Sequence, residues 1–219
     1  MSFTFPLHRD IGGGLLLTHT RPGHAGALAE LQAIVFPDLA PQERFSAANY
    51  RKHVEIFPEG QMLVLDGERA AGMTTTIRMG FDFEASAQHS FAEVSAGGDL
   101  TTHEPDGEWL YGMDIGTHPE YRRRGIAKAL YRARQDLVRH LGLRGQVTVG
   151  MMNGYGAVKQ DMTAEEYFEK LKAGAVYDPT VSTQCRLGFR PMCLVPDYLH
   201  DPTCDNYGVL IALDADIDI

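Results

Sequence analysis

Cysteine is scarce in this sequence, and long apolar runs are missing. The 219 residues include 3 cysteines, Cys185, Cys193 and Cys204, an odd number without a close pair at metal-ligand spacing. This pattern predicts neither a disulfide framework nor a zinc site. No apolar stretch approaches the roughly 20 residues of a membrane span, and the N-terminus lacks a basic segment followed by an apolar run. We therefore expect a cytoplasmic protein with no membrane partner and no metal.

Positive charge is also in deficit. The chain carries 20 Lys and Arg residues against 29 Asp and Glu residues, and its formal net charge at pH 7 is -9. A general nucleic-acid binder has the opposite balance, so nucleic acid is not an expected partner. The negative charge faintly favours amine partners, although a charge that only keeps the protein soluble explains it as well.

The length and the apolar content bound the domain organisation. With 44% hydrophobic residues in 219, the chain can build one good core and is short for two, so we expect a single domain over residues 1–219. Residues 1–14 end in three glycines and are expected as a flexible N-terminal extension. Residues 80–107 are expected as a long excursion before the central strand, with room for one short helix.

Apolar periodicity and turn residues predict a chain of alternating helices and strands. Ser46 and Thr163 are typical helix N-caps, and Asp66-Gly67 is typical of a hairpin turn. We expect strands at 15–19, 61–65, 70–79, 109–116, 146–152, 192–195 and 207–213, and helices at 25–35, 46–56, 126–141, from 163 onward, and at 181–187.

The segment from Leu110 to Leu130 is predicted to form a strand, a tight turn and a helix that opens on Gly125. Such a turn brings unpaired backbone N–H groups and the positive end of a helix to one place, where a phosphate can bind the main chain. The apolar stripe of the helix is expected to pack on the sheet. Its basic residues are expected to lie off that stripe: Lys128, Arg132, Arg134 and Arg139.

Asp114 lies between two glycines in the predicted strand. Glycine weakens a strand unless a ligand or another backbone approaches closely, so the pattern indicates a carboxylate that faces a cavity. A hydrogen-bonded or solvated strand residue is the alternative. Alternation predicts that Asp114 shares a face with Leu110, Gly112 and Gly116 while the odd-numbered residues of 109–115 face the core; a β-bulge would exchange the faces.

Residues 118–130, HPEYRRRGIAKAL, closely resemble the acetyl-CoA-binding motif of the GNAT superfamily of N-acetyltransferases, Arg/Gln-x-x-Gly-x-Gly/Ala. Residues 187–191 are similar to the Leu-Gly-Phe segment after the family's last helix, and residues 147–153 to its fifth strand, which ends in Asn. Over about residues 90–213 the chain resembles a subgroup, the GNAT domains fused or adjacent to nitrilase-like carbon–nitrogen hydrolases. The matching segments of this subgroup are 105–112, 162–167, 171–179 and 196–199.

This resemblance implies the fold and the cofactor. The expected fold is the GNAT fold of the α/β (α+β) class. Its mixed, mostly antiparallel sheet is splayed between the fourth and fifth strands, has helices on both faces and holds acetyl-CoA where these strands part. The cofactor-binding positions that it implies are Ile115, Gly116 and Thr117 for the thioester and pantetheine, Arg122, Arg123, Arg124, Gly125, Ile126, Ala127 and Lys128 for the pyrophosphate, and Asn153 near the pantetheine arm.

Direct transfer to an amine needs a base that takes the amine proton. We expect Asp114 to be this base, directly or through a water. The weaker alternatives are Glu108, His103 and His118; a histidine that precedes a proline in a turn is more often structural than catalytic.

An acid that protonates the departing thiolate is also useful. The family's usual acid is a tyrosine three residues before the Leu of Leu-Gly-Phe, and here this position is Gln184. Tyr177 is our expected substitute. Tyr155, Cys185, or a reaction without any acid are the open alternatives.

The expected function is therefore an N-acetyltransferase that transfers acetyl from acetyl-CoA to a primary amine of an unidentified small molecule or protein. The alternative is a non-catalytic acyl-CoA-binding GNAT module that regulates or partners a carbon–nitrogen hydrolase. A homodimer is possible for this superfamily. A dinucleotide oxidoreductase, suggested by Gly154-x-Gly156, is rejected because the third glycine and the following helix are missing.

Overall fold

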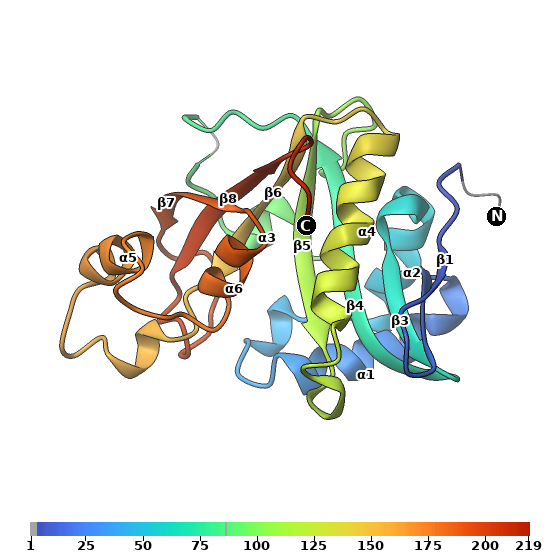
Figure 1. The fold of residues 1–219 in the computed structure, drawn as a ribbon, viewed down its shortest axis with the longest axis horizontal. Helices are drawn as coiled ribbons and strands as arrows, with labels where there is room; N and C mark the ends of the chain where they lie inside the picture. Colours follow the sequence, from blue (N-terminus) through green and yellow to red (C-terminus); the bar gives the residue numbers. More distant parts are fainter. Residues whose placement is uncertain (1–3, 86) are drawn as a thin grey trace.

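The computed structural model describes residues 4–85 and 87–219. Residues 1–3 and 86 lie outside the described residues, so the extension at 1–14 and the excursion at 80–107 are considered only over their remaining parts. The described chain forms one sheet in the order β1-β2-β3-β4-β5-β6-β8-β7 (Figure 1). Its strands are β1 (His8–Asp10), β2 (Leu15–His19), β3 (Met62–Asp66), β4 (Arg69–Met79), β5 (Trp109–Thr117), β6 (Gly145–Met151), β7 (Arg190–Val195) and β8 (Gly208–Asp214).

The pairing of the strands confirms a mixed, mostly antiparallel sheet. Among the described strands β5 and β6 pair in parallel, and every other neighbouring pair is antiparallel. The edge strand β1 pairs with β2, so part of the extension that was predicted to be flexible belongs to the sheet.

Helices lie at the predicted places. Ser46 and Thr163 each accept a hydrogen bond from the backbone N–H three residues later, and both belong to capping boxes. The excursion at 80–107 contains the one short helix that was expected. The α-helices are α1 (Ala25–Val35), α2 (Ala47–Ile56), α3 (Phe91–Val94), α4 (Ile126–His140), α5 (Ala164–Lys172) and α6 (Val181–Arg186).

Two apolar clusters cover the two faces of the sheet. Ile126, Leu130 and Leu137 of α4 pack in one cluster, and Leu28 of α1 and Tyr50 of α2 belong to the other. Figure 1 shows α4 in front of the central strands and α2 behind them. Helices on both faces, as the resemblance implied, are confirmed.

β5 and β6 separate along their length. Their parallel pairing joins Trp109–Gly112 to Gly145–Thr148 and ends there, while β6 stays paired with β8 as far as Met151. The C-terminal halves of β5 and β6 therefore diverge. They are the fourth and fifth of the predicted strands, so the expected splay is present.

A β-bulge at Met113 reverses which side chains of β5 face each side of the sheet after this residue. Thr75 pairs with Asp114 and Thr76 pairs with Gly112, so Met113 is an extra residue on β5. Asp114 consequently faces α2, where it meets Tyr50, whereas Gly112 faces α4. The prediction that Asp114 and Gly112 share a face is wrong, because the alternation of the sequence does not reveal a bulge.

Within the described part of the chain, none of the helices combines the length and the apolar character that crossing a membrane requires.

Candidate active site

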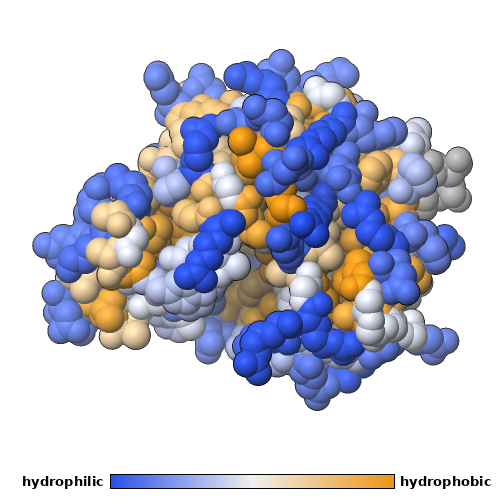
Figure 2. Space-filling view, in the orientation of Figure 1, coloured by the Kyte–Doolittle hydropathy of each residue, from blue (hydrophilic) through white to orange (hydrophobic). Residues whose placement is uncertain are grey.

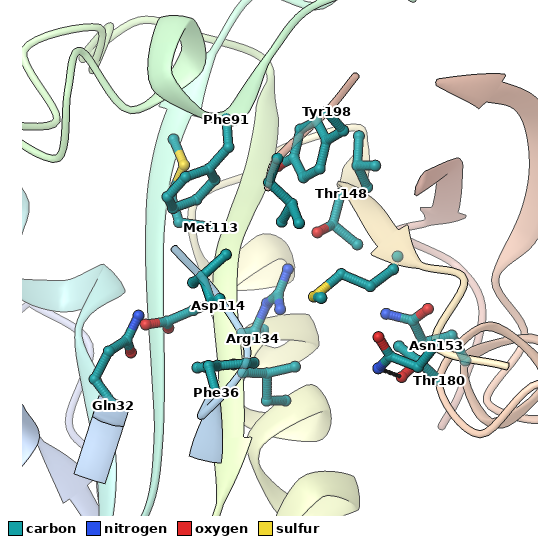
Figure 3. A pocket seen from close by; sticks show the side chains of 17 residues that line it. Gln32, Phe36, Phe91, Met113, Asp114, Arg134, Thr148, Asn153, Thr180 and Tyr198 are labelled. Carbon is teal, nitrogen blue, oxygen red and sulfur yellow. Dashed lines mark hydrogen bonds between the residues drawn. The ribbon is translucent and has the colours of Figure 1, made fainter. Parts of the chain in front are cut away.

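A cavity lies where β5 and β6 separate. Figure 2 shows the surface hollowed between α6 and the N-terminal end of α4, with apolar residues on the floor and hydrophilic residues on the rim. Figure 3 shows that side chains from both faces of the sheet meet inside it. The lining residues are Gln32, Phe36, Leu39, Phe91, Met113, Asp114, Ile115, Arg134, Thr148, Val149, Gly150, Met151, Asn153, Thr180, Gln184, Tyr198 and Leu199.

Asp114, the predicted base, lies in this cavity. The backbone N–H of Thr75 donates to its Oδ1 at 2.6 Å, and the Tyr50 hydroxyl lies 3.3 Å from its Oδ2. Burial raises the pKa of Asp114 to about 6, and these hydrogen bonds to the ionised form oppose a larger rise. A carboxylate with a pKa of about 6 is ionised at neutral pH and is still a usable proton acceptor.

Tyr50 and Gln32 lie beside Asp114 on the α2 side of the sheet. The Tyr50 hydroxyl lies 2.8 Å from Oε1 of Gln32 and 3.3 Å from Oδ2 of Asp114, and its single proton can serve one of them at a time. Tyr50 lies in the helix expected at 46–56, but its position beside Asp114 was not predicted from the sequence. A signal was present in α1, where the buried Gln32 occupies a core-facing position.

The turn before α4 has the properties of an anion site. Gly125 is the N-cap with φ 81°, no side chain caps the helix, and Arg123 also has positive φ, 63°. The first intrahelical bond runs from the N–H of Ala129 to Gly125. Among the described residues no acceptor is found for the backbone N–H groups of residues 123–128. These N–H groups are therefore available to donate hydrogen bonds to an external acceptor.

The basic side chains around this turn are exposed. Arg124 is directed toward the N-terminal segment, because its Nη2 donates to the carbonyl of Gly13 at 2.9 Å and its guanidinium lies over the Tyr121 ring. Arg122, Arg123 and Lys128 have no such tether in the described structure, so they are free to approach an anion at the turn.

Ile115 and Asn153 lie on opposite walls of the cavity. The Thr74 hydroxyl donates to the Asp114 carbonyl at 2.7 Å and draws it toward β4. The N–H of the same trans peptide group, that of Ile115, therefore points toward the gap beside β6. Across the gap, Nδ2 of Asn153 donates to the Thr180 hydroxyl at 2.7 Å.

Tyr177, the predicted acid, lies elsewhere. Its side chain is 56% exposed, its hydroxyl is 3.3 Å from that of Thr183, and the Arg186 guanidinium covers its ring. Together with Cys185 it lines a different hollow, so the structure does not bring it to Asp114. Tyr155 also lies outside the residues that line the cavity.

The alternative bases lie outside the cavity as well. Glu108 is at the surface near Arg144, at 3.5 Å. Nδ1 of His103 accepts the backbone N–H of Arg78, and His118 accepts a hydrogen bond from Arg69. Of these candidates, only Asp114 faces the space between β5 and β6.

Gln184, at the position where the resemblance implied a tyrosine, forms part of the cavity wall. Its Nε2 donates to the Tyr131 hydroxyl at 2.8 Å. Its Oε1 is buried without a hydrogen-bond partner. An amide can donate or accept a hydrogen bond, but it cannot protonate a thiolate.

Arg134 was predicted to lie off the apolar stripe of α4 and is instead almost completely buried, with 1% of its surface exposed. Its guanidinium reaches between β5 and β6 past Gly112, where a Cβ atom would lie 1.9 Å from Nη2. The glycine thus makes room for the arginine. In the described structure, no group of three or more His, Cys, Asp or Glu side chains could hold a metal ion.

Comparison with known proteins agrees with this geometry. The sequence profile of the acetyltransferase (GNAT) family matches residues 27–155, more than half of the chain. The uncharacterized N-acetyltransferase YkwB of Bacillus subtilis (strain 168) is 33% identical over 185 residues, which cover 84% of this chain and 81% of YkwB.

The probable hydrolase YhcX of the same bacterium is 35% identical over 185 residues, which cover 84% of this chain. They cover 35% of YhcX, so the chain spans about a third of that relative's length. Among solved structures, the GNAT-like decarboxylase GphF in complex with isobutyryl-CoA has a TM-score of 0.74 at 21% identity, covering 91% of this chain and 98% of GphF.

The raised pKa of Asp114 predicts a cost to stability. A carboxyl group whose pKa is raised in the folded state lowers the free energy of unfolding when it is ionised. This loss of stability is absent at a pH below the unfolded pKa and complete above about pH 6. A rise of about two units corresponds to about 3 kcal/mol. About a third of this cost is already present at pH 4.5, above the unfolded pKa of 3.8, so we expect Asp114→Asn to raise the free energy of unfolding by about 2 kcal/mol more at pH 8 than at pH 4.5, measured by urea denaturation.

Asp136→Asn is the matched control, because Asp136 is a partly exposed aspartate paired with Arg9 on the surface. Its effect should stay within about 1 kcal/mol at both pH values. Equal effects of Asp114→Asn at pH 4.5 and pH 8 would contradict the raised pKa.

Proposed function

The chain belongs to the acetyltransferase (GNAT) family, and from this premise we propose that it is an acyl-CoA-dependent N-acyltransferase. It transfers an acyl group, acetyl in the simplest case, directly from the CoA thioester to a primary amine. The observation that carries the proposal is the position of Asp114, in a cavity that opens beside a helix N-terminus whose amides lack internal partners.

The N-terminus of α4 is proposed to bind the pyrophosphate of CoA. The unpaired N–H groups of residues 123–128 supply hydrogen bonds, and the helix dipole favours negative charge at this end. The exposed side chains of Arg122, Arg123 and Lys128 add positive charge. Together these groups supply the hydrogen-bond donors and the positive charge that a pyrophosphate needs, and no metal ion is required.

The cleft between β5 and β6 is proposed to hold the pantetheine arm and the thioester. The Ile115 N–H points into the gap and can donate to the thioester carbonyl, where negative charge develops during acyl transfer. Gly116 and Thr117 continue the same strand edge, which β6 leaves unpaired. Asn153 closes the gap from the other side.

Asp114 is proposed to accept the amine proton. It faces the α2 side of the sheet, so the amine approaches from that side, between Gln32, Phe91 and Tyr198. The largely apolar walls limit water around the carboxylate and raise its pKa. The acceptor is a small molecule or the amine of a protein.

The thiolate of CoA is proposed to leave without a protein acid. Gln184 occupies the usual position of the acid, and the exposed Tyr177 lines another hollow. A thiolate is a good leaving group near neutral pH, because the thiol pKa of a free Cys is only about 8.5. The amide of Gln184 can stabilise the departing sulfur by a hydrogen bond.

A binding module is the second candidate function. The glutamine at the acid position and the match to one third of a probable hydrolase favour it: the domain would bind acyl-CoA and regulate or partner a carbon–nitrogen hydrolase. Measurement of CoA release over a panel of amines separates the candidates. Acceptor-dependent release supports the transferase, and tight acyl-CoA binding without any release supports the module.

Gly125→Val should weaken acetyl-CoA binding at least about tenfold, since a side chain there strains the left-handed backbone and shifts several charge-assisted hydrogen bonds. Isothermal titration calorimetry measures the dissociation constant. Gly142→Val is the control, because Gly142 has a similar φ of 65° at the other end of α4. It should cost stability and leave binding unchanged. Equal affinities of wild type and Gly125→Val would refute the pyrophosphate placement.

Asp114→Asn should lower kcat by about 100-fold or more and leave acetyl-CoA affinity within about twofold, because it removes the base and spares the cofactor site. In the wild type, kcat/KM should rise with pH through about 6, where Asp114 ionises. The variant should lose this limb. A normal rate with an unchanged pH profile would exclude Asp114 as the base.

A further inference from the structure

The least satisfied charge in the cavity belongs to Arg134. Its Nε and Nη2 are buried without a hydrogen-bond partner. No carboxylate of the described residues lies within 4 Å of its guanidinium. The guanidinium lies over the Tyr131 ring, 5.3 Å from its centre. Figure 3 shows it reaching into the cavity between Asp114 and Thr148.

Asp114 does not neutralise Arg134. Its Oδ1 accepts the backbone N–H of Thr75, and its Oδ2 lies 3.3 Å from the Tyr50 hydroxyl on the α2 side of the sheet. The attraction between the two charges acts across the cavity and not through a hydrogen bond. Each side chain therefore presents to the same space a charge that has no directly bonded counter-ion among the described residues.

A buried, unpaired cation costs stability, and an apolar side chain of similar volume would be more favourable for folding. Residues that break a packing rule in this way are typical of functional sites. Here the sheet accommodates the buried Arg134, because Gly112 has no side chain and leaves space for the guanidinium. Among the residues that line the cavity, Arg134 is the only basic one.

We propose that Arg134 binds a carboxylate in the cleft between β5 and β6, and that this carboxylate is the far end of the acyl chain. The acyl donor would then be the CoA thioester of a dicarboxylic acid, of the malonyl or succinyl class. The fork of the guanidinium matches a carboxylate with two parallel hydrogen bonds. This inference rests on the proposed function and names the acyl group that the same site takes.

The position of Arg134 favours the acyl chain as the source. Arg134 lies about 12 Å along the axis of α4 from Ile126, at the level of Gly112. A pyrophosphate at the N-terminus of α4 and a thioester at Ile115 direct the acyl chain toward Gly112, where the cleft closes. A carboxylate of the acceptor amine is the other source of the same chemistry, but it would have to reach Arg134 from the α2 side, past Asp114.

Calorimetric titration with acetyl-CoA, malonyl-CoA and succinyl-CoA tests the proposal. The wild type should bind one of the two carboxylated thioesters about ten- to hundredfold more tightly than acetyl-CoA. Arg134→Met should abolish this preference and leave acetyl-CoA affinity within about threefold. Arg132→Met, which changes an exposed arginine of the same helix, should keep the preference.

Folding is checked in the same variants. Arg134→Met should have an equal or higher Tm, since it replaces an unpaired buried charge by an apolar side chain. Arg134→Lys is the second variant, and it should keep only part of the preference, because an ammonium lacks the fork. The comparison of thioesters in the wild type does not depend on either variant.

The acceptor is tested as the source with acetyl-CoA at saturation. An amino acid should react no faster than its amide, because in the proposed assignment Arg134 binds the acyl chain and not the carboxylate of the acceptor. A preference for the acid that Arg134→Met removes would overturn the acyl-chain assignment and place the acceptor's carboxylate at Arg134. Equal affinity for all three thioesters, with no preference for acids, would overturn the proposal and leave the transferase standing. Failure to bind even acetyl-CoA would overturn the proposed function itself.

Discussion

Hydrogen bonding between β5 and β6 ends at Gly112 and Thr148, and the site depends on the space that this leaves. The Thr148 hydroxyl donates to the Gly112 carbonyl at 2.6 Å and closes the inner end of the cleft. Beyond it, the edge of β5 that faces β6 has no hydrogen-bonded partner strand, so the Ile115 N–H faces the gap. The α4 N-terminus lies beside the open end. A single interruption in a sheet thereby brings together a helix N-terminus with unpaired amides, the free Ile115 N–H and the carboxylate of Asp114, the three groups that the proposed function uses.

The cavity keeps two opposite charges apart. Asp114 reaches it through the bulge at Met113, and Arg134 reaches it past a glycine. If the two side chains formed an ion pair, the carboxylate would be a weaker base and the guanidinium would be neutralised. Thr75 and Tyr50 hold Asp114 away from such a pair. Both charges lower stability, which is the usual relation between a preorganised site and folding.

Much of the fold and the turn before α4 could be predicted, because they depend on local patterns. Helix caps such as Ser46 and Thr163, and the glycine that opens α4, act through residues three or four positions away. The turn is built by the main chain, so a motif of a few residues specifies it. The family resemblance then supplied the mixed, mostly antiparallel sheet and its splay between the fourth and fifth strands, which no local pattern contains.

The rest of the site depends on contacts between distant segments. The bulge at Met113 arises from pairing with β4, and alternation along β5 alone predicts the opposite face for Asp114. The burial of Arg134 follows from the absence of a side chain at Gly112, on another element. Tyr177 is near α6 in sequence but lies on the surface. These are properties of packing, and the 3.6-residue period does not encode them.

The central claim is that the cleft between β5 and β6 binds an acyl-CoA thioester. A crystal structure of the protein with CoA tests it most directly. The pyrophosphate oxygens should lie within about 3.2 Å of backbone amides of residues 123–128, and the CoA sulfur should lie in the gap between Ile115 and Asn153. CoA bound elsewhere, for example in the hollow beside Tyr177 and Arg186, would contradict the claim.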